Sequence, residues 1–359
     1  MYYLCPADPE FWKGNILRSD AFPDGYYGYR NQYAVFGSDY KREEIGSVTV
    51  LDSLEDLPAD AWDVSESGDG RVMAWVVPNG ELYDLFIGGE GGVCAGSSCE
   101  ELFSWYKNAT HIDLGERFDT SSVQDMSEMF YACYSLQELV LGDRFDTSSV
   151  QDMSMMFNYC DSLQKLNLGD CFDTSNVQDM SDMFYYCSTL TELTLGNCFD
   201  TSNVQDMRCM FFLCTSLSEL TLGDRFDTSK VQDMSWMFSD CDSLEELTLG
   251  DHFDTTKVQN MSCMFSGCNS LQELTLGDRF DTSNVQGMNR MFSGCFSLEV
   301  LTLGDRFDTS KVQDMRSMFY YCKSLTELTL GDKFVTTNAD TTDMFHNCPA
   351  GENYTHLVH

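Results

Sequence analysis

The sequence predicts an α/β solenoid in which parallel strands stack on one side and capped helices stack on the other, connected in the right-handed sense. Three observations predict it. The chain repeats itself every 27 residues, each repeat contains a short strand-like segment, and each contains an apolar pattern with helical spacing. Such a period is typical of stacked arrays in which each unit contacts only its neighbours.

Two columns of residues define the period. They hold one phenylalanine and one cysteine per repeat: Phe118, Phe145, Phe172, Phe199, Phe226, Phe253, Phe280, Phe307 and Phe334, then Cys133, Cys160, Cys187, Cys214, Cys241, Cys268, Cys295 and Cys322. A repeat of this size buries too little apolar surface to offset the entropy of ordering it. We therefore expect the repeats to fold only as a stack.

The strand-like segment is SLQELVLG in the first regular repeat. Leu139 and Leu141 alternate with Glu138 and Val140, as in a strand with one buried face. The spacing L-x-x-L-x-L is that of the strand in leucine-rich repeats. Gly142 marks the end of the strand.

The segment before each strand predicts an α-helix. Its apolar residues have the spacing of one helix face: Val123, Met126, Met129, Phe130 and Cys133. Ser121 stands three residues before Gln124, the spacing of a capping box, and the pair recurs in the other regular repeats, once with threonine. We therefore expect one capped helix per repeat.

The pattern divides the chain into five parts. We expect a loop-rich region at 1–45, a cap with a β-hairpin at 46–90, a degenerate first repeat at 91–117, eight regular repeats at 118–333, and a degenerate last repeat with a C-terminal cap at 334–359. The hairpin is predicted from the strand-like runs on either side of Asn79-Gly80. We expect it to cover the open edge of the first repeat.

Composition limits the partners. The net charge is −37, which repels nucleic acid and anionic membranes. No run of 18 apolar residues is long enough to span a membrane, and no charged and apolar leader pattern opens the chain. We expect a monomer that binds a protein partner, with neither nucleic acid nor a membrane span involved.

The sixteen cysteines do not have the pattern of a disulfide framework. The cysteine column lies among methionine, phenylalanine and leucine, and therefore predicts packed thiols. Cys171 and Cys198 lie outside the column on neighbouring repeats. They are the best candidates for a disulfide bond.

The repeat FDTSNVQDMSDMFYYCSTLTELTLG at 172–196 and its copies resemble the BspA-like leucine-rich repeat family of bacterial surface proteins, a repeat type also found in some Mycoplasma lipoproteins. The lead-in, PADAWDV followed by VMAWVVPNGELYDLFIGG, is similar to what precedes such arrays. The resemblance implies a protein-binding solenoid at the cell surface or secreted, often used in adhesion. With no export signal visible, a cytoplasmic location is the alternative.

Catalysis is not expected. The five histidines lack the spacing of metal ligands, and the G-V-C-A-G segment at 92–96 has no histidine nearby in the sequence. Pairs such as Asp143 and Asp146 supply too few oxygens for calcium. Hydrogen bonding of Asp and Ser side chains to the backbone of the turns explains these aspartate pairs better. We therefore predict no enzyme activity, no cofactor and no metal.

Two surfaces are candidate protein-binding sites. One consists of aromatic residues on the outer side of the predicted helices: Tyr131, Tyr159, Tyr185, Tyr186, Phe212, Trp236, Tyr320 and Tyr321. Exposed aromatic patches are typical of interaction sites. The alternative interpretation is that these rings pack between neighbouring helices. The exposure of these rings to solvent distinguishes the two interpretations. We predict that Tyr131, Tyr185 and Phe212 form one exposed strip.

The other surface is the outward face of the strands, with uniform columns that include Glu192, Glu219, Glu246 and Glu273, and Thr194, Thr221, Thr248 and Thr275. It would suit a basic or repetitive ligand, although a solvated surface of strand-forming residues is the favoured interpretation. Two further functions stay open: an intracellular acidic decoy, scaffold or inhibitor that acts by charge, and a structural spacer without a ligand.

Overall fold

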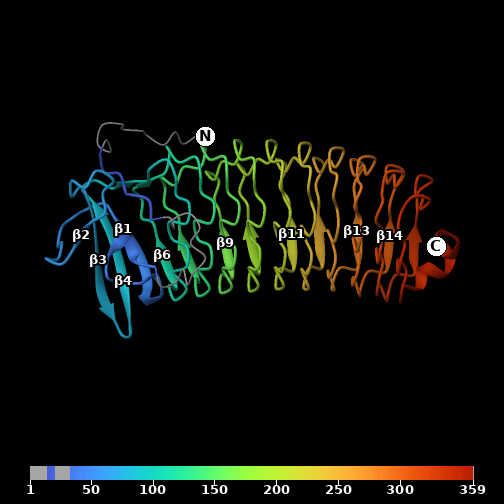
Figure 1. Ribbon diagram of the computed structural model, residues 1–359, viewed down its shortest axis with the longest axis horizontal. Coiled ribbons are helices and arrows are strands. Elements are labelled where there is room, and N and C mark those ends of the chain that lie inside the picture. The colour runs from blue at the N-terminus through green and yellow to red at the C-terminus, as the bar shows by residue number, and fades with distance from the viewer. Residues whose placement is uncertain (1–13, 21–32, 359) are drawn as a thin grey trace. The chain divides into compact units, whose positions relative to one another are not determined.

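The computed structural model describes residues 14–20 and 33–358, and the chain divides into two compact units (Figure 1). The first unit comprises Met1–Leu163 with Cys171–Asp173, and the second comprises Gln164–Asp170 with Thr174–His359. Part of the region predicted as loop-rich, 1–45, lies outside the described residues. No helix among the described residues is long and apolar enough to cross a membrane.

A six-stranded sheet organises the first unit (Figure 1). Its order is β2-β3-β4-β1-β6-β8, with bounds Trp62–Asp63, Val72–Asn79, Leu82–Gly89, Ile45–Leu51, His111–Asp113 and Glu138–Val140. A two-stranded sheet pairs β5, Val93–Cys94, with β7, Phe118–Asp119. Two short 3-10 helices, η2 at Val35–Gly37 and η3 at Arg42–Glu44, precede β1.

The predicted hairpin is present, formed by β3 and β4 with Asn79 paired to Leu82. Its position differs from the expectation. Strand β1 lies between the hairpin and the repeats, parallel to β4 on one side and to β6 on the other. The segment IGSVTVL therefore covers the edge of the first repeat, because its run of strand-forming residues pairs with both neighbours. The sequence analysis missed this strand.

The second unit repeats one short strand per 27 residues. These strands are β9 to β15, at Lys165–Asn167, Glu192–Thr194, Glu219–Thr221, Glu246–Thr248, Glu273–Thr275, Val300–Thr302 and Glu327–Thr329. Parallel pairing joins β9 to β10, β11 to β12, β13 to β14, and β14 to β15. Equivalent residues pair across each ladder, as Leu274 does with Leu301. The predicted strand is thus confirmed, in small parallel sheets.

The predicted α-helices are wrong. Within residues 14–20 and 33–358 the structure has no α-helix, and the segment after each phenylalanine of the 27-residue column is a series of tight turns. Two residues of the first regular repeat have positive φ, 54° at Glu128 and 58° at Ala132. The residues at the equivalent positions of the other repeats also have positive φ. A right-handed helix excludes such residues.

Backbone hydrogen bonds explain why turns replace the helix. The N–H groups of Met126, Glu128 and Phe130 donate to carbonyls of the next repeat at 2.9 Å, including that of Asp152 for Met126. Identical repeats side by side therefore satisfy the backbone that a helix would satisfy internally. Successive turns still direct the apolar residues inward, which is why helical spacing and burial coincide here.

The capping-box interpretation fails with the helix. The N–H of Ser121 donates to the Asp119 carboxylate at 3.0 Å, forming an Asx turn. The N–H of Gln124 donates to the Ser97 carbonyl one repeat earlier, at 2.9 Å. The serine and the glutamine therefore recur in the repeats because they lie in a turn that stacks on the neighbouring repeat, and not because they begin a helix.

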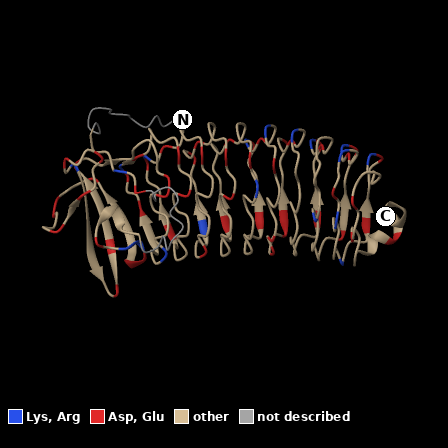
Figure 2. Ribbon diagram, viewed as in Figure 1, with Lys and Arg blue, Asp and Glu red and all other residues tan. Residues whose placement is uncertain are grey.

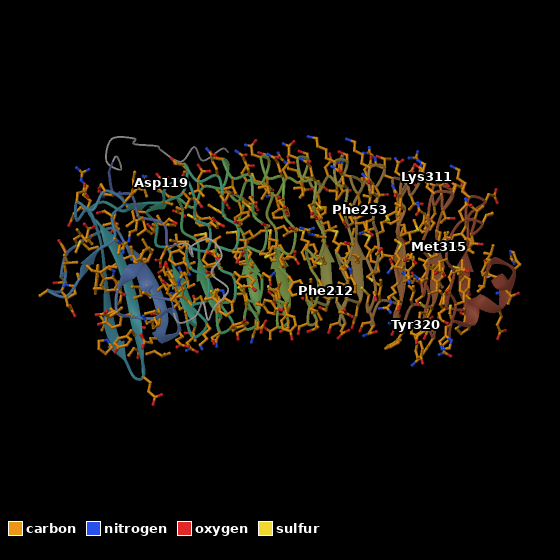
Figure 3. The ribbon with its side chains drawn as sticks, viewed as in Figure 1. Asp119, Phe212, Phe253, Lys311, Met315 and Tyr320 are labelled. Atoms are coloured by element: carbon orange, nitrogen blue, oxygen red, sulfur yellow. The ribbon has the colours of Figure 1, made fainter. Side chains whose placement is uncertain are left out.

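The core consists of ladders that cross the repeats. Rings of the column that begins at Phe118 stack with centroids 6.2–6.5 Å apart, as Phe253 does with Phe280. A second ladder includes Phe211 and Phe238 at 5.6 Å. Met315, between the two edges of its repeat in Figure 3, is fully buried, as are the equivalent methionines. Offset stacking of this kind stabilises beyond area burial alone.

Buried threonines add a polar ladder that the sequence analysis missed. The hydroxyl of Thr228 donates to the Asp254 carbonyl at 2.9 Å, and equivalent threonines make the same bond at 2.7–2.9 Å. Most of these side chains have no exposed surface. Each hydroxyl is thus satisfied inside the core, as burial requires.

The cysteine column carries buried thiols, as predicted. In the second unit, the Cys241 thiol donates to the Phe211 carbonyl at 3.1 Å. Cys171 is exposed and Cys198 is half-buried, and both carry thiols. The disulfide suggested for this pair is therefore absent from the structure.

At the end of the second unit, η4, Pro349–Leu357, is a 3-10 helix that follows the last repeat. Pro349 is the first residue of η4. The Tyr354 hydroxyl donates to the Leu328 carbonyl at 2.6 Å, and the Ala350 N–H donates to the Leu325 carbonyl at 3.0 Å. The element thus provides partners for carbonyls of the final repeat.

Candidate binding surfaces

Four of the predicted aromatic residues meet in the second unit. Tyr185 contacts Phe212 with ring centroids 5.0 Å apart, Phe212 contacts Trp236 at 5.4 Å, and Tyr185 contacts Tyr186 at 6.4 Å. All four are half-buried. We call this group the aromatic cluster. Each ring packs on a neighbour and keeps part of its surface in solvent, so both sequence interpretations apply in part.

The remaining predicted aromatic residues lie in other groups. In the first unit, Tyr131 contacts Trp105 at 5.8 Å and Tyr159 at 6.1 Å. Near the end of the second unit, Tyr320 and Tyr321 contact each other at 4.5 Å. The structure therefore brings Tyr185 and Phe212 together, as predicted, and places Tyr131 in the other unit.

Several aromatic residues lie where the backbone disfavours them. Trp236 has φ 62° and Tyr186 has φ 59°, and both values lie in the left-handed region. Glycine stands at the position of Tyr186 in two other repeats, Gly267 and Gly294, both with positive φ. A side chain in this conformation costs about 1–2 kcal/mol relative to glycine. The large rings are thus placed where the backbone alone would favour a smaller residue.

The strand face is the more exposed surface. Glu219 and Glu246 pair across β11 and β12, and both side chains are exposed. The threonines of the strand face, Thr194, Thr221, Thr248 and Thr275, are exposed as well. Figure 2 shows acidic residues recurring on the strands of the second unit. A shallow cavity of about 340 Å³ lies over β13 and β14, lined by Glu273 and Thr275 among others. This face is acidic and lacks aromatic side chains.

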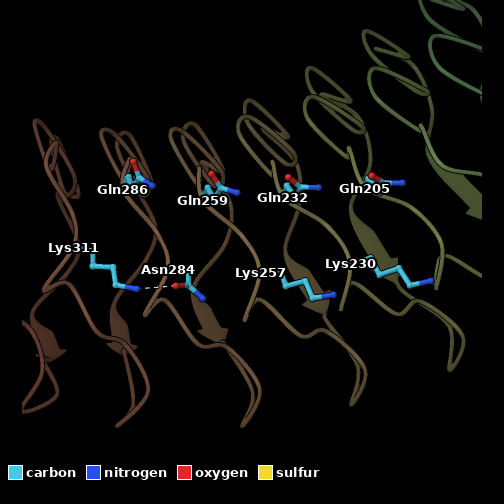
Figure 4. A pocket seen from close by; sticks show the side chains of 8 residues that line it. All are labelled: Gln205, Lys230, Gln232, Lys257, Gln259, Asn284, Gln286 and Lys311. Carbon is cyan, nitrogen blue, oxygen red and sulfur yellow. Dashed lines mark hydrogen bonds between the residues drawn. The ribbon is translucent and has the colours of Figure 1, made fainter.

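A cationic groove in the second unit was missed by the sequence analysis (Figure 4). Its volume is about 460 Å³, and it is lined by two columns: Gln205, Gln232, Gln259 and Gln286, and Lys230, Lys257, Asn284 and Lys311. No acidic residue is among these eight. The lysines recur immediately before the valine of the repeat, a signal that is visible in the sequence although acidic residues greatly outnumber basic ones.

Backbone bonds hold the groove in register. The N–H of Gln259 donates to the Gln232 carbonyl, and that of Gln286 donates to the Gln259 carbonyl, at 2.9 and 2.8 Å. The Lys311 ammonium donates to the Asn284 side chain at 2.8 Å, and the Lys230 ammonium donates to that of Asn203 at 2.5 Å. In both columns, successive side chains are therefore one repeat apart.

The corner aspartates act in turns, as the sequence suggested. The Asp308 carboxylate accepts the N–H of Ser310 at 2.9 Å, and hydrogen bonds from Ser310 lower the pKa of Asp308. Asp146 accepts the N–H of Ser148 in the same way. Among the residues that the structure describes, no group of three or more His, Cys, Asp or Glu is arranged to hold a metal ion.

Comparisons with known proteins cover the repeats. A family model described as "Mycoplasma protein of unknown function, DUF285" matches residues 97–197, 192–275 and 245–356 in tandem. The search of curated proteins and the search of solved structures found no match. The three matches together span more than half of the chain and follow the 27-residue repeats described above. The chain therefore belongs to this family of Mycoplasma-type repeat proteins.

Proposed function

We propose that this chain is a non-enzymatic, protein-binding leucine-rich repeat protein of the BspA-like type, which acts in adhesion or host interaction at a bacterial surface or after secretion. The L-x-x-L-x-L strands, the stacked repeats and the family match support this proposal. A stacked array presents long, regular surfaces and suits binding better than it suits the assembly of a catalytic site. We propose that it acts as a monomer without a cofactor.

One observation carries the choice of surface: large aromatic side chains of the aromatic cluster occupy left-handed backbone positions. Trp236 and Tyr186 both have positive φ, in columns where several but not all of the other repeats carry small or polar residues. Backbone strain of this kind is often found at functional sites. Partly exposed aromatic rings are also the residues that contribute most to protein interfaces.

The experiment measures binding to a panel of purified, immobilised extracellular-matrix and serum proteins. We compare the unmodified protein with the double variant Phe212→Ala and Trp236→Ala, and we expect at least a tenfold loss of affinity for any partner that binds. The matched control is the double variant Thr221→Ala and Thr248→Ala, which changes exposed strand-face residues. Equal affinity of the aromatic variant and the unmodified protein would overturn the proposed surface.

A second variant separates binding from folding. Replacing Tyr186 by glycine relieves about 1–2 kcal/mol of backbone strain and removes a ring contact worth about 0.5–1.5 kcal/mol. The two effects nearly cancel, so we expect unfolding by urea to change little while partner affinity falls. A large loss of stability would show that the ring acts in packing.

The strand face supports the second candidate, a decoy, scaffold or inhibitor that binds a basic partner by charge. Its glutamate columns are exposed and regularly spaced. Binding by charge weakens steeply as salt rises, because the Debye length falls from about 8 Å at 0.15 M to about 3 Å at 1 M. An aromatic contact keeps its affinity in the same titration. A structural spacer, the third candidate, binds no protein of the panel in either condition.

A further inference from the structure

The cationic groove is chemically distinct from the rest of this acidic chain. Three lysines, Lys230, Lys257 and Lys311, line it together with side-chain amides, and the lining contains no acidic and no aromatic residue. Lys257 has no hydrogen-bond or ion-pair partner among residues 14–20 and 33–358. The acidic side chain of the same loop as Lys311, Asp308, is engaged by Ser310.

The groove is also separate from both surfaces considered above. In Figure 3, Lys311 and Tyr320 lie at opposite edges of the same repeat. The glutamates of the strand face do not line the groove. A ligand held here would therefore leave the aromatic residues at the other edge accessible.

Its geometry is periodic. Figure 4 shows the glutamine column and the lysine-asparagine column running in parallel across successive repeats. Neighbouring parallel strands are about 4.8 Å apart, so the backbone positions of Lys230 and Lys257 are separated by about that distance and those of Lys257 and Lys311 by about twice as much. A ligand that contacts all three lysines must be extended and must repeat its charges along its length.

We propose that this groove binds a linear anionic polysaccharide, with the lysine ammonium groups contacting carboxylate or sulfate groups and the glutamine amides contacting sugar hydroxyls. Lysine offers three donors as a compact point charge. Each glutamine offers two donors and one acceptor, which suits hydroxyl groups that both donate and accept. An acidic peptide fits less well, because the groove has no apolar pocket for an anchoring side chain.

The net charge of −37 opposes any anionic ligand at long range. At 0.15 M salt, screening limits this repulsion to about 8 Å. Within that distance the lysine ammonium groups attract a bound chain. The Asp308 carboxylate, whose pKa is lowered by hydrogen bonds from Ser310 and also by the nearby charge of Lys311, offsets part of that attraction. The test is therefore made at this ionic strength.

The test measures affinity of the full chain for four defined polymers by calorimetry: polygalacturonate, heparin, dextran and poly-L-glutamate. We expect binding to polygalacturonate, heparin or both, at least tenfold tighter than to dextran or poly-L-glutamate. Polygalacturonate carries carboxylates alone, whereas heparin also carries sulfates, so the two arms identify the anionic group. Binding to none of the polymers, or equal binding to poly-L-glutamate, overturns the proposal.

Two triple variants with the same change of charge locate the site. The variant Lys230→Gln, Lys257→Gln and Lys311→Gln should lose at least tenfold in affinity. The control Lys165→Gln, Lys323→Gln and Lys333→Gln removes three exposed lysines elsewhere and should keep it. Equal losses in both variants would assign binding to overall charge and contradict the groove.

The amide column has its own variant, Gln232→Ala with Gln259→Ala. It should weaken polysaccharide binding severalfold and leave any residual affinity for poly-L-glutamate unchanged, because only the sugar has hydroxyls to contact. Unchanged polysaccharide affinity contradicts the role of the amides. Unfolding by urea, compared across all variants, shows whether the fold is intact, which we expect because every substituted side chain is exposed.

Discussion

At the scale of single residues, the chain depends on polar groups that are satisfied inside the core. The threonine of each D-T-S motif has its hydroxyl bonded to a backbone carbonyl one repeat away, as in the pair Thr228 and Asp254. The buried cysteine of most repeats donates its thiol to a backbone carbonyl of the repeat before it, as Cys241 does to Phe211. Small buried donors thus link neighbouring repeats without requiring side chains of opposite charge.

The variant Thr228→Val tests this ladder. It keeps the shape of the side chain and removes the hydroxyl, which leaves a buried carbonyl without its donor. We expect a loss of about 1–2 kcal/mol in the free energy of unfolding, measured by urea denaturation. Thr248→Val on the exposed strand face is the matched control and should change stability by less than about 0.5 kcal/mol. Equal effects would show that the hydroxyl of Thr228 contributes nothing.

The buried thiols predict a loss of stability at alkaline pH. Burial raises the pKa of the Cys295 thiol to about 12, and burial with nearby carboxylates raises that of Cys209 to about 12. Their ordinary value is 9.0. Because the folded-state pKa is raised, the stabilisation is complete below pH 9 and falls as pH rises toward 12, by up to about 1.4 kcal/mol per pH unit for the fully buried Cys295 and by less for the partly exposed Cys209.

We expect this loss in urea denaturation at pH 8, 9.5 and 10.5 under reducing conditions. Cys295→Ala should reduce the slope of stability against pH. A stability that stays constant across this range would show that the thiols are accessible in the folded protein. Alkylation of the folded protein gives an independent measurement, in which exposed Cys171 should react before the buried column.

At the scale of elements, a buried ion pair connects the N-terminal segment to the first repeat. The Arg42 guanidinium is fully buried, lies 3.1 Å from the Asp20 carboxylate, and donates to the Ser104 carbonyl at 2.6 Å. It also lies over the Tyr106 ring, 5.3 Å from the centroid. The Arg42 side chain therefore contacts both the N-terminal segment that contains Asp20 and the first repeat, which contains Ser104 and Tyr106.

Arg42→Met breaks this connection and leaves a buried carboxylate without its cation. We expect a loss of about 3–5 kcal/mol, seen as faster hydrogen exchange of the β1 amides. Arg71→Met is the control, since Arg71 pairs with Asp69 at 3.1 Å but is half exposed. The control should cost less than about 1 kcal/mol. Protection of β1 that is unchanged in Arg42→Met would contradict the role of the ion pair.

At the scale of the whole molecule, the excess of negative charge sets the response to pH and salt. Burial raises the pKa of Asp161 to about 6, and burial also raises the pKa of Asp182, Asp206 and Asp240. A carboxyl whose pKa is higher in the folded state favours folding when protonated. Stability therefore falls as pH rises from about 4 through about 6. Mutual repulsion of the other carboxylates acts in the same direction.

We expect the Tm to be higher at pH 5.5 than at pH 8, and to rise at pH 8 as sodium chloride is increased from 0.02 to 0.5 M. Asp161→Asn should raise stability at pH 8 by about 1 kcal/mol, a value reduced for the solvent exposure of the side chain, and should flatten the pH profile. A Tm that stays constant or falls from pH 8 to pH 5.5 would contradict this prediction, because carboxylates with lowered pKa, such as Asp308, lose their stabilising contribution only below about pH 4.

The period, the strands and the buried columns follow from the sequence, because residues that recur every 27 positions among apolar neighbours must occupy equivalent sites. The tight turns between the strands could not be predicted from the sequence. Val123, Met126 and Phe130 have the spacing of a helix, yet their backbone bonds to the next repeat. The positive φ of Glu128 and Ala132 accompanies these hydrogen bonds between repeats.

The aromatic cluster was found in part from the sequence, since Tyr185 and Phe212 recur in one column. The cationic groove was not, because three lysines are few among 58 acidic residues and only stacking aligns them with the glutamines. The sequence by itself thus determined which side chains are buried and how often they recur. The tertiary structure decided where each N–H finds its acceptor, because an acceptor one repeat away exists only once the repeats are stacked.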